Sequence, residues 1–299
     1  MLLPLIDYNF SLTLLTFALL GIGNTILQVS LNPMIAQVVS EKKMASILTL
    51  GQFVKAISSF LGPVIAGIAA SYWGNWKLIF VVYAGTTLLA GIWLLLSIDT
   101  DSPQNVKTTT SFRSALALFS DKIILWLFIG ILAVVGIDVG LNTHIPKLLM
   151  AQTGLSLNEA GLGTSLYFIS RTAGTFFGAL LLTRIDSKIF MQSGMIIAIA
   201  AFAALLVSDQ LWLLLLWIVI IGLACSNVFS ILFSYALKHK PEHANEISAL
   251  MIMGVSGGAL IMPFMGVLSD GYGQIAGLLP LLLCMVYLLW TTGKLGKQS

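Results

Sequence analysis

Long apolar segments recur along the whole chain, and polar residues gather in the shorter stretches between them. Runs of about 18 or more apolar residues predict helices that cross a lipid bilayer. Alternating segments of roughly 10 residues, which a transmembrane β-barrel needs, are absent from the sequence. We therefore predict an all-α, polytopic helical membrane protein with about nine transmembrane helices. The predicted spans are 9–36, 44–70, 76–98, 122–149, 158–184, 188–207, 210–237, 245–268 and 272–293.

Composition supports this class. Of the 299 residues, 58% are hydrophobic and only 9% are charged, which is too little charge to cover a soluble domain of this length. The net charge of +3 comes from residues scattered among loops, so it does not indicate nucleic-acid binding. Cys225 and Cys284 both fall inside apolar runs, which favours buried thiols over a disulfide or a metal pair.

The loops predict the orientation in the membrane. Eleven lysines and arginines fall in loops on one side of the predicted spans, and only Lys77 and Lys147 fall on the other side. Cytoplasmic loops carry the excess of basic residues. We therefore expect the long polar link 99–121 and the C-terminus to be cytoplasmic, and residue 1 to lie outside.

An internal repeat predicts the domain organisation. The segments around Pro63 and Pro263 resemble each other at an offset of 200 residues. Two parallel halves of six helices would be complete if three helices were missing before the first span. Residues 1–98 would then be the remainder of an N-terminal bundle (helices equivalent to 4–6). The link 99–121 would be a cytoplasmic linker, and 122–299 a six-helix bundle (equivalent to 7–12). A natural nine-helix protein is the alternative.

Three amides form a stripe on the first predicted span. Asn24, Gln28 and Asn32 are spaced four residues apart, so they share one helix face over about 12 Å. Lipid cannot satisfy an amide, so this face should meet protein or a wet cavity. We predict that it lines a cavity; the alternative is hydrogen bonding between helices, worth about 1 kcal/mol per contact.

Gln52 and Lys55 share a face of the second span. A lysine near the middle of a membrane helix costs about 2.5–3.5 kcal/mol on insertion scales. These two residues are therefore predicted to line the same cavity. A structural ion pair with a missing helix would also explain the lysine.

Spans four and five carry opposite charges at membrane depth. Asp138, with Asn142 one turn further on, lies in span four, and Arg171 lies in span five on the same face as Tyr167 and Thr175. A pair in low dielectric would keep both side chains ionised, whereas a lone Asp would be pushed toward protonation. We predict a role in proton coupling or gating, with a static buried salt bridge as the alternative.

Span seven carries Asn227 among serines, a weaker signal for a substrate contact. Gly254–Gly266 and Leu61–Gly67 are small-residue surfaces with a proline, which suit close packing or a hinge.

The sequence has no P-loop, H-E-x-x-H, C-x-x-C or G-x-S-x-G motif, and its three histidines are dispersed. An enzyme, a metal site and a cofactor are therefore not expected.

Several of these segments resemble the major facilitator superfamily, and within it the fucose–galactose–glucose proton symporter family of bacteria. Gly21–Pro33, ending in Q-V-S-L-N-P, is similar to that family's fourth-helix motif. V-G-I-D-V-G around Asp138 resembles the seventh-helix motif, and S-L-Y-F-I-S-R-T-A-G around Arg171 resembles the eighth. G-G-A-L-I-M-P-F-M-G-V-L-S-D, at residues 257–270, resembles the eleventh helix and is the most specific match.

The resemblance implies sugar:proton symport by alternating access, by a monomer in the bacterial cytoplasmic (inner) membrane. A hexose would bind near the midplane between two pseudo-symmetric bundles, because amides both donate to and accept from hydroxyls. The expected substrate-binding residues are Asn24, Gln28, Asn32, Gln52, Lys55, Asn142 and Asn227. The sequence departs from the family at three points. Gln28 stands where fucose-type members have an acid, and Lys55 lies near a position where the family usually has Asn. The segment that would carry the family's first-helix acidic residue is expected to be absent.

Two other functions fit the same residues. A facilitator that exports drugs or organic anions would use Lys55 and Arg171 to attract negative charge. A truncated membrane protein that binds or senses its ligand without transporting it would fit the missing helices.

Overall fold

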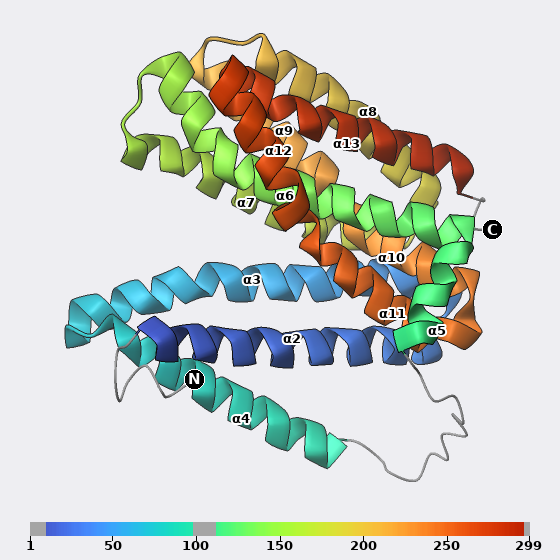
Figure 1. Ribbon diagram of the computed structural model, residues 1–299. Helices are drawn as coiled ribbons and strands as arrows, with labels where there is room; N and C mark the ends of the chain where they lie inside the picture. Colours follow the sequence, from blue (N-terminus) through green and yellow to red (C-terminus); the bar gives the residue numbers. More distant parts are fainter. Residues whose placement is uncertain (1–9, 98–111, 296–299) are drawn as a thin grey trace. The chain divides into compact units, whose positions relative to one another are not determined.

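The computed structural model describes residues 10–97 and 112–295, and the regular structure in these ranges is helical throughout (Figure 1). The α-helices are α2 (Phe10–Val38), α3 (Glu41–Trp73), α4 (Ile79–Ser97), α5 (Phe112–Ala117), α6 (Lys122–Thr153), α7 (Leu157–Leu181), α8 (Ser187–Leu206), α9 (Leu211–Cys225), α10 (Val228–His239), α11 (Ala244–Met253), α12 (Gly257–Tyr272) and α13 (Gln274–Lys294). Short 3-10 helices are η1 (Trp76–Leu78), η2 (Leu118–Ser120), η3 (Pro241–His243) and η4 (Gly254–Ser256). The predicted all-α membrane fold is confirmed. The N-terminal residues 1–6 and most of the predicted linker lie outside the described residues.

Seven segments of the described chain are long and apolar enough to cross a membrane. They are Phe10–Ala36, Ile79–Leu96, Lys122–Thr153, Ser187–Leu206, Leu211–His239, Pro241–Tyr272 and Gln274–Lys294. The other two predicted spans, 44–70 and 158–184, form α3 and α7. Each of these helices carries a charged residue within the predicted span, Lys55 or Arg171, which lowers its apolar character.

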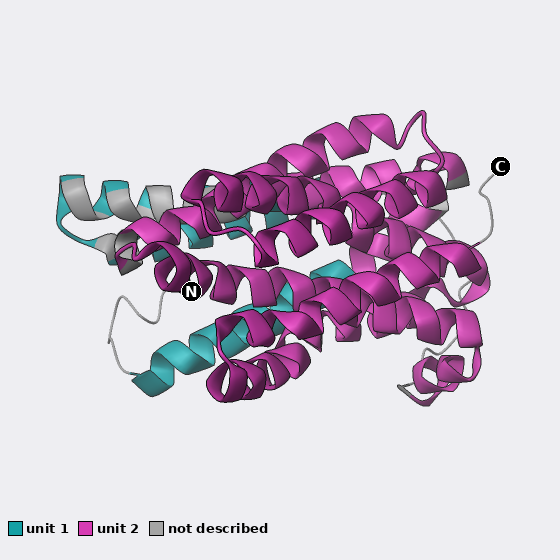
Figure 2. Ribbon diagram, turned by 90° about the horizontal axis from the view of Figure 1, so that it is seen from above, with its two compact units in different colours: residues 1–28, 55–110 teal, residues 29–54, 111–299 magenta. Residues whose placement is uncertain are grey.

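The chain forms two compact units (Figure 2). Unit 1 contains residues 1–28 and 55–110, and unit 2 contains residues 29–54 and 111–299. Unit 2 thus includes the end of α2 and the first part of α3. Within unit 2, Ser46 Oγ donates to Ala179 O at 2.6 Å, and Ser248 Oγ donates to Val29 O at 3.0 Å. The predicted domain boundary at the linker stays a prediction.

Helix α6 lies at the centre of unit 2 and packs against α7, α10, α12 and α13. Its buried apolar residues follow helical spacing, as an amphipathic or interior helix requires; they include Ile124, Leu127, Ile131, Val134 and Leu141. The helix ends at Gly154, whose φ of 70° is a left-handed conformation that suits glycine. This central position places the side chains of α6 next to those of the other helices of unit 2.

The start of α6 is fixed by the carboxylate of Asp121. Its Oδ1 accepts from the backbone amides of Ile123 (2.9 Å) and Ile124 (3.3 Å), and its Oδ2 contacts Lys240 Nζ (2.8 Å) and His239 Nε2 (3.1 Å). Burial acts to raise the pKa of Asp121, but the hydrogen bonds from Lys240, His239 and the two amides outweigh it and hold that pKa well below its usual range. The carboxylate therefore ties the end of α10 to the start of α6 at neutral pH.

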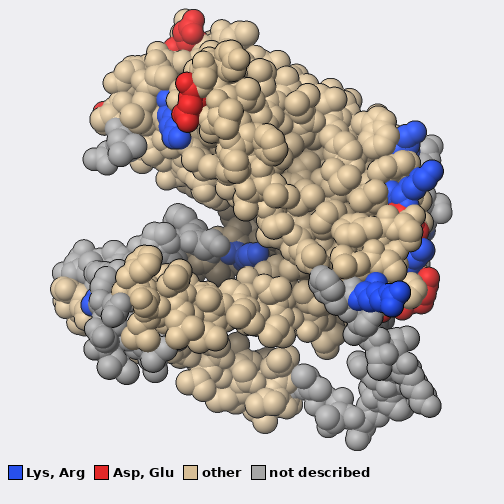
Figure 3. All heavy atoms as spheres, in the orientation of Figure 1, with Lys and Arg blue, Asp and Glu red and all other residues tan. Residues whose placement is uncertain are grey.

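Basic residues gather at this end of unit 2. Lys188 Nζ, at the start of α8, donates to Leu295 O just after α13 at 2.6 Å. The starts of α6 and α8 and the ends of α10 and α13 therefore lie at the same end of unit 2, and each carries a lysine. Figure 3 shows Lys and Arg atoms along the edge where α13 ends in Figure 1. This is the pattern that the positive-inside argument predicted for one face of the membrane.

The glycines of η4 and α12 bring these segments against α6. A Cβ at Gly257 would lie 2.6 Å from Leu132 Cα, and one at Gly258 would lie 2.7 Å from a methyl carbon of Val139. A Cβ at Gly254 would lie 2.9 Å from Ile131. Small residues allow this close approach of helices in membranes. Close packing is therefore what the Gly254–Gly258 part of the small-residue surface does in this structure.

Two predicted spans are interrupted. Span 210–237 breaks at Ser226 and Asn227, between α9 and α10, and span 245–268 changes to the 3-10 helix η4 between α11 and α12. Non-regular backbone at membrane depth is tolerated where it is buried in protein. Both breaks lie against other helices of unit 2, the first against α7 and the second against α6.

Candidate functional site

Two helices carry charged side chains to the middle of unit 2. Asp138 lies 16 residues after the first residue of α6 and 15 before the last, so it is roughly 22–24 Å from either end. Helix α7 begins with a capping box in which Ser156 Oγ accepts from the backbone amide of Glu159, while the Glu159 carboxylate accepts from the Ser156 amide at 3.0 Å. Arg171 follows 14 residues after the start of α7, about 21 Å along it. Both charges therefore lie well inside helices that the sequence predicts to cross the membrane.

The two charges form an ion pair, which is one of the two arrangements that the sequence left open; their role in proton coupling or gating stays a prediction. Arg171 Nη2 contacts Asp138 Oδ2, and Tyr167 Oη donates to Asp138 Oδ1 at 2.8 Å. The Asp138 and Arg171 side chains are 13% and 24% exposed, and Tyr167 is fully buried. We call Asp138, Tyr167 and Arg171 the Asp138 cluster. Both carboxylate oxygens of Asp138 have donors in this cluster.

Electrostatics explains why these residues occur together. A single charge at the bilayer centre is costly, so ionisable residues there pair with each other or face a cavity. Removing one partner of a buried pair costs about 3–5 kcal/mol, because the other charge is left uncompensated. The ionised carboxylate of Asp138 and the guanidinium of Arg171 therefore stabilise each other at this depth.

Tyr167 was not among the predicted site residues. Its spacing of four from Arg171 places both side chains on the same face of α7, and that shared face was visible in the sequence. What periodicity could not supply was the position of Asp138 opposite Tyr167. That position follows from how α6 and α7 pack, which only the structure gives.

Asn227 is buried where α9 meets α10 and is 1% exposed. Its Nδ2 donates to Gly174 O on α7 at 3.0 Å and to Ser226 Oγ at 2.6 Å. A Cβ at Gly178 would overlap the Asn227 amide. Its Oδ1 is buried without a hydrogen-bond partner in the part of the chain that the structure describes. In this structure Asn227 therefore joins two helices, and its substrate contact stays a prediction.

Asn142 lies one turn beyond Asp138 on α6, with an exposed side chain. Its backbone carbonyl accepts a hydrogen bond from Thr164 Oγ1 of α7 at 3.3 Å. The amide itself is free of the tight packing that surrounds Asn227. The amide is therefore accessible, and its contact with a substrate stays a prediction.

The remaining predicted contacts belong to α2 and α3. Because α2 is a single helix, Asn24, Gln28 and Asn32 do share one of its faces. Asn32 and Gln52 are half-buried members of unit 2, whereas Asn24, Gln28 and Lys55 belong to unit 1. Their roles in substrate binding stay predictions.

Within residues 10–97 and 112–295, no three His, Cys, Asp or Glu side chains group as metal ligands. Cys225 is buried and Cys284 is half-buried, and both are free thiols.

Comparison with known proteins decides the family. The profile of the Major Facilitator Superfamily matches residues 1–150 and 138–298. The chain belongs to the major facilitator superfamily. Members of this superfamily are transport proteins, which confirms that this facilitator is not an enzyme.

A relative from Brucella abortus, described as a glucose/galactose transporter, is 25% identical over 99% of this chain and 74% of its own length. The crystal structure of the major facilitator FucP in the outward conformation matches with a TM-score of 0.82 at 16% identity, over 98% of this chain and 78% of FucP. The crystal structure of a single-residue variant of the Escherichia coli fucose:proton symporter FucP matches with a TM-score of 0.78 at 17% identity, over the same shares of both chains. These likenesses confirm the predicted placement beside the fucose–galactose–glucose symporters.

Proposed function

We propose that this facilitator is a secondary active transporter that moves a hexose together with a proton by alternating access. The relatives support a sugar substrate, because one is described as a glucose/galactose transporter and another as a fucose:proton symporter. The observation that carries the proposal is the Asp138 cluster, which places an ionisable carboxylate at membrane depth beside an arginine and a tyrosine.

The cluster can bind and release a proton. While Asp138 is ionised, its oxygens hold the donors of Arg171 and Tyr167. A proton on one carboxylate oxygen removes the negative charge and converts that oxygen to a donor, so the ion pair with Arg171 is lost. Protonation would thus loosen the connection between α6 and α7, and in a symporter this loosening would accompany substrate movement.

A neutral sugar fits better than an organic anion. The charge of Arg171 is already balanced by Asp138, so it is not available to hold an anionic substrate. Asn142 and the predicted amide stripe of Asn24, Gln28 and Asn32 can both donate to and accept from sugar hydroxyls. An anion exporter would need an unbalanced cation in this region instead.

Asp138→Asn tests the proposal. The substitution would keep the size of the side chain, but the new amide could not take up a proton, so hexose-driven alkalinisation outside cells or vesicles should disappear. Labelled hexose should then reach only equal concentrations on both sides, while exchange between internal and external hexose, which needs no net proton movement, should continue. Asp209→Asn, in the exposed α8–α9 loop, is the matched control and should retain accumulation.

Accumulation of hexose by Asp138→Asn against a gradient would contradict the role of Asp138. Hexose binding without uptake by the unchanged protein would indicate a membrane sensor rather than a transporter. Stronger binding of sugar acids or sugar phosphates than of neutral hexoses would favour the anion exporter.

A further inference from the structure

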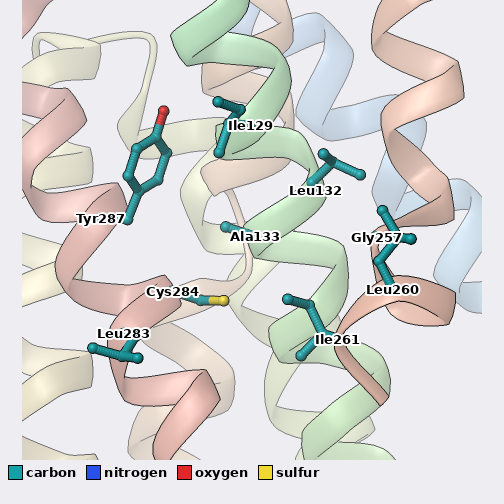
Figure 4. Close-up of a pocket in the computed structure, with 9 residues that line it drawn as sticks. All are labelled: Ile129, Leu132, Ala133, Gly257, Leu260, Ile261, Leu283, Cys284 and Tyr287. Atoms are coloured by element: carbon teal, nitrogen blue, oxygen red, sulfur yellow. The ribbon is translucent and has the colours of Figure 1, made fainter. Parts of the chain in front are cut away.

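An apolar groove lies among three helices of unit 2, away from the Asp138 cluster (Figure 4). It has a volume of about 270 Å³ and is lined by residues of α6, α12 and α13, including Ile129, Ala133, Leu260, Ile261, Leu283 and Cys284. Figure 4 shows the α6 side chains between those of α13 and α12. The groove therefore belongs to a single packed unit.

The groove opens toward the surroundings of the bundle. Leu260 and Leu283 on its rim are 54% and 71% exposed, and Ile129 is 37% exposed. Exposed leucines on transmembrane helices suit contact with lipid chains, which are equally apolar. The groove is therefore accessible from the bilayer.

The lining offers few hydrogen bonds to a polar ligand. Tyr287 contributes a side-chain hydroxyl to the lining, but this hydroxyl already donates a hydrogen bond to Trp126 O at 2.9 Å. The other lining side chains are apolar, apart from the thiol of Cys284. A sugar would leave its hydroxyls unpaired here, so the occupant must be a hydrocarbon.

One end of the groove leads to aromatic and basic residues. Trp126 and Trp290 stack edge to face with 5.3 Å between ring centroids, which places the start of α6 beside the end of α13. Lys294 Nζ lies 5.6 Å from the centre of the Trp290 ring. Tryptophan and tyrosine favour the headgroup level of a bilayer, so this end marks a membrane surface.

The distances along the helices suit one lipid molecule. Ile129 follows Lys122 by seven residues on α6, and Tyr287 precedes Lys294 by seven residues on α13. Each separation is about 10 Å along the helix axis. A headgroup at the lysines would therefore place the first part of its acyl chain at the groove.

We propose that this groove binds one acyl chain of an anionic phospholipid, whose headgroup lies against Lys122 and Lys294. Both lysines are exposed, and the neighbouring carboxylate of Asp121 is already paired with Lys240. The site is shaped by fixed packing, because the backbones of α12 and α6 meet at Gly257 on its wall.

The lysines, rather than the groove, give the site its selectivity. Lipid chains are as apolar as the groove, so chain burial alone does not favour one phospholipid over another. Basic residues at a membrane surface attract anionic headgroups, and this attraction is screened by salt. We expect the purified protein to retain phosphatidylglycerol roughly tenfold more strongly than phosphatidylcholine with the same chains.

Native mass spectrometry of the full chain in detergent with these two lipids tests the site. Lys122→Gln with Lys294→Gln should reduce the preference for phosphatidylglycerol to near equality. Ala133→Phe fills the groove, and Leu260→Trp obstructs its rim at an exposed position where folding is not at risk; both should remove the retained lipid. Ala203→Phe, at an exposed position on α8, is the matched control and should keep it.

A photoreactive group on the acyl chain of phosphatidylglycerol locates the contact. Labelling should concentrate on peptides of α6, α12 and α13 and should fall in Leu260→Trp. Even labelling of all the lipid-facing helices would overturn the proposal. So would undiminished retention in both Ala133→Phe and Leu260→Trp, or equal retention of both phospholipids by the unchanged protein.

Discussion

Asp138, Tyr167 and Arg171 show how single residues can hold charge inside an apolar bundle. The carboxylate of Asp138 accepts from the guanidinium on one oxygen and from the phenol on the other. A carboxylate with donors on both oxygens is stabilised in its ionised form. Tyr167 is therefore a positioning residue for Asp138, in addition to the charge balance that Arg171 supplies.

Loss of the Tyr167 hydroxyl should weaken the protein and its uptake. Tyr167→Phe removes a hydrogen bond to a charged group, which is worth about 1.5–3 kcal/mol, and it should lower the unfolding temperature in detergent. Tyr287→Phe is the control, because it removes a hydrogen bond to the neutral carbonyl of Trp126, worth about 1 kcal/mol. Hexose accumulation should fall in Tyr167→Phe and persist in Tyr287→Phe. Equal thermal losses in the two variants would argue that Asp138 is not ionised in the folded protein.

At the scale of elements, two glycines of α7 make room for polar side chains at the junction between α9 and α10. Gly174 and Gly178, one turn apart on α7, leave room for Ser226 and Asn227 at the α9–α10 junction. The Asn227 amide donates to Gly174 O, so the broken backbone gains a partner on α7. The break is thus stabilised by the helix beside it rather than by its own sequence.

A methyl group at Gly178 should reveal this dependence. Gly178→Ala places a Cβ within the space of the Asn227 amide, and overpacking of this kind costs about 1–3 kcal/mol. Gly161→Ala, on the same helix, meets nothing within 4 Å and should be neutral or stabilise the helix by up to about 1 kcal/mol.

In the double variant Gly178→Ala with Asn227→Ala, the overlap is gone, so the cost of the glycine change should largely vanish. Thermal unfolding of the single and double variants gives the coupling energy. Additive losses would show that Gly178 and Asn227 do not depend on each other.

The sequence predicted helices better than it predicted their interruptions. Apolar runs give the existence and approximate length of each span, because burial in lipid demands them. The Asp138–Arg171 pair was foreseeable because both charges fall near the middle of consecutive helices, which run in opposite directions. The break at Asn227 and the 3-10 turn at Gly254–Ser256 were not foreseeable, because they depend on which helix lies against them. For the same reason, helical periodicity placed Asn227 on a face but could not show that α7 covers it.

At the scale of the whole molecule, the arrangement of unit 2 makes the orientation testable. The contacts of Asp121 with Lys240 and of Lys188 with Leu295 gather helix ends that carry basic residues. The positive-inside rule assigns these ends to the cytoplasm. The α8–α9 loop lies at the other end of the same helices and should face outward.

Membrane-impermeant maleimide can test this orientation. In a background with Cys225 and Cys284 replaced by alanine, Asp209→Cys in the exposed α8–α9 loop should be labelled in intact cells. Thr183→Cys, in the exposed α7–α8 turn, should be labelled only after the membrane is opened. The reverse pattern would place the basic end outside and would contradict the predicted cytoplasmic C-terminus.

The balance of charge between Asp138 and Arg171 has an electrical consequence. While the pair is intact it carries no net charge, so the membrane voltage exerts no net force on it. A proton bound at Asp138 leaves Arg171 as one positive charge at mid-depth, and moving such a charge across the full potential is worth about 2.3 kcal/mol per 100 mV. An inside-negative voltage would then draw the protonated cluster inward and exert no net force on the unprotonated pair. The voltage would therefore favour inward transport over the return step.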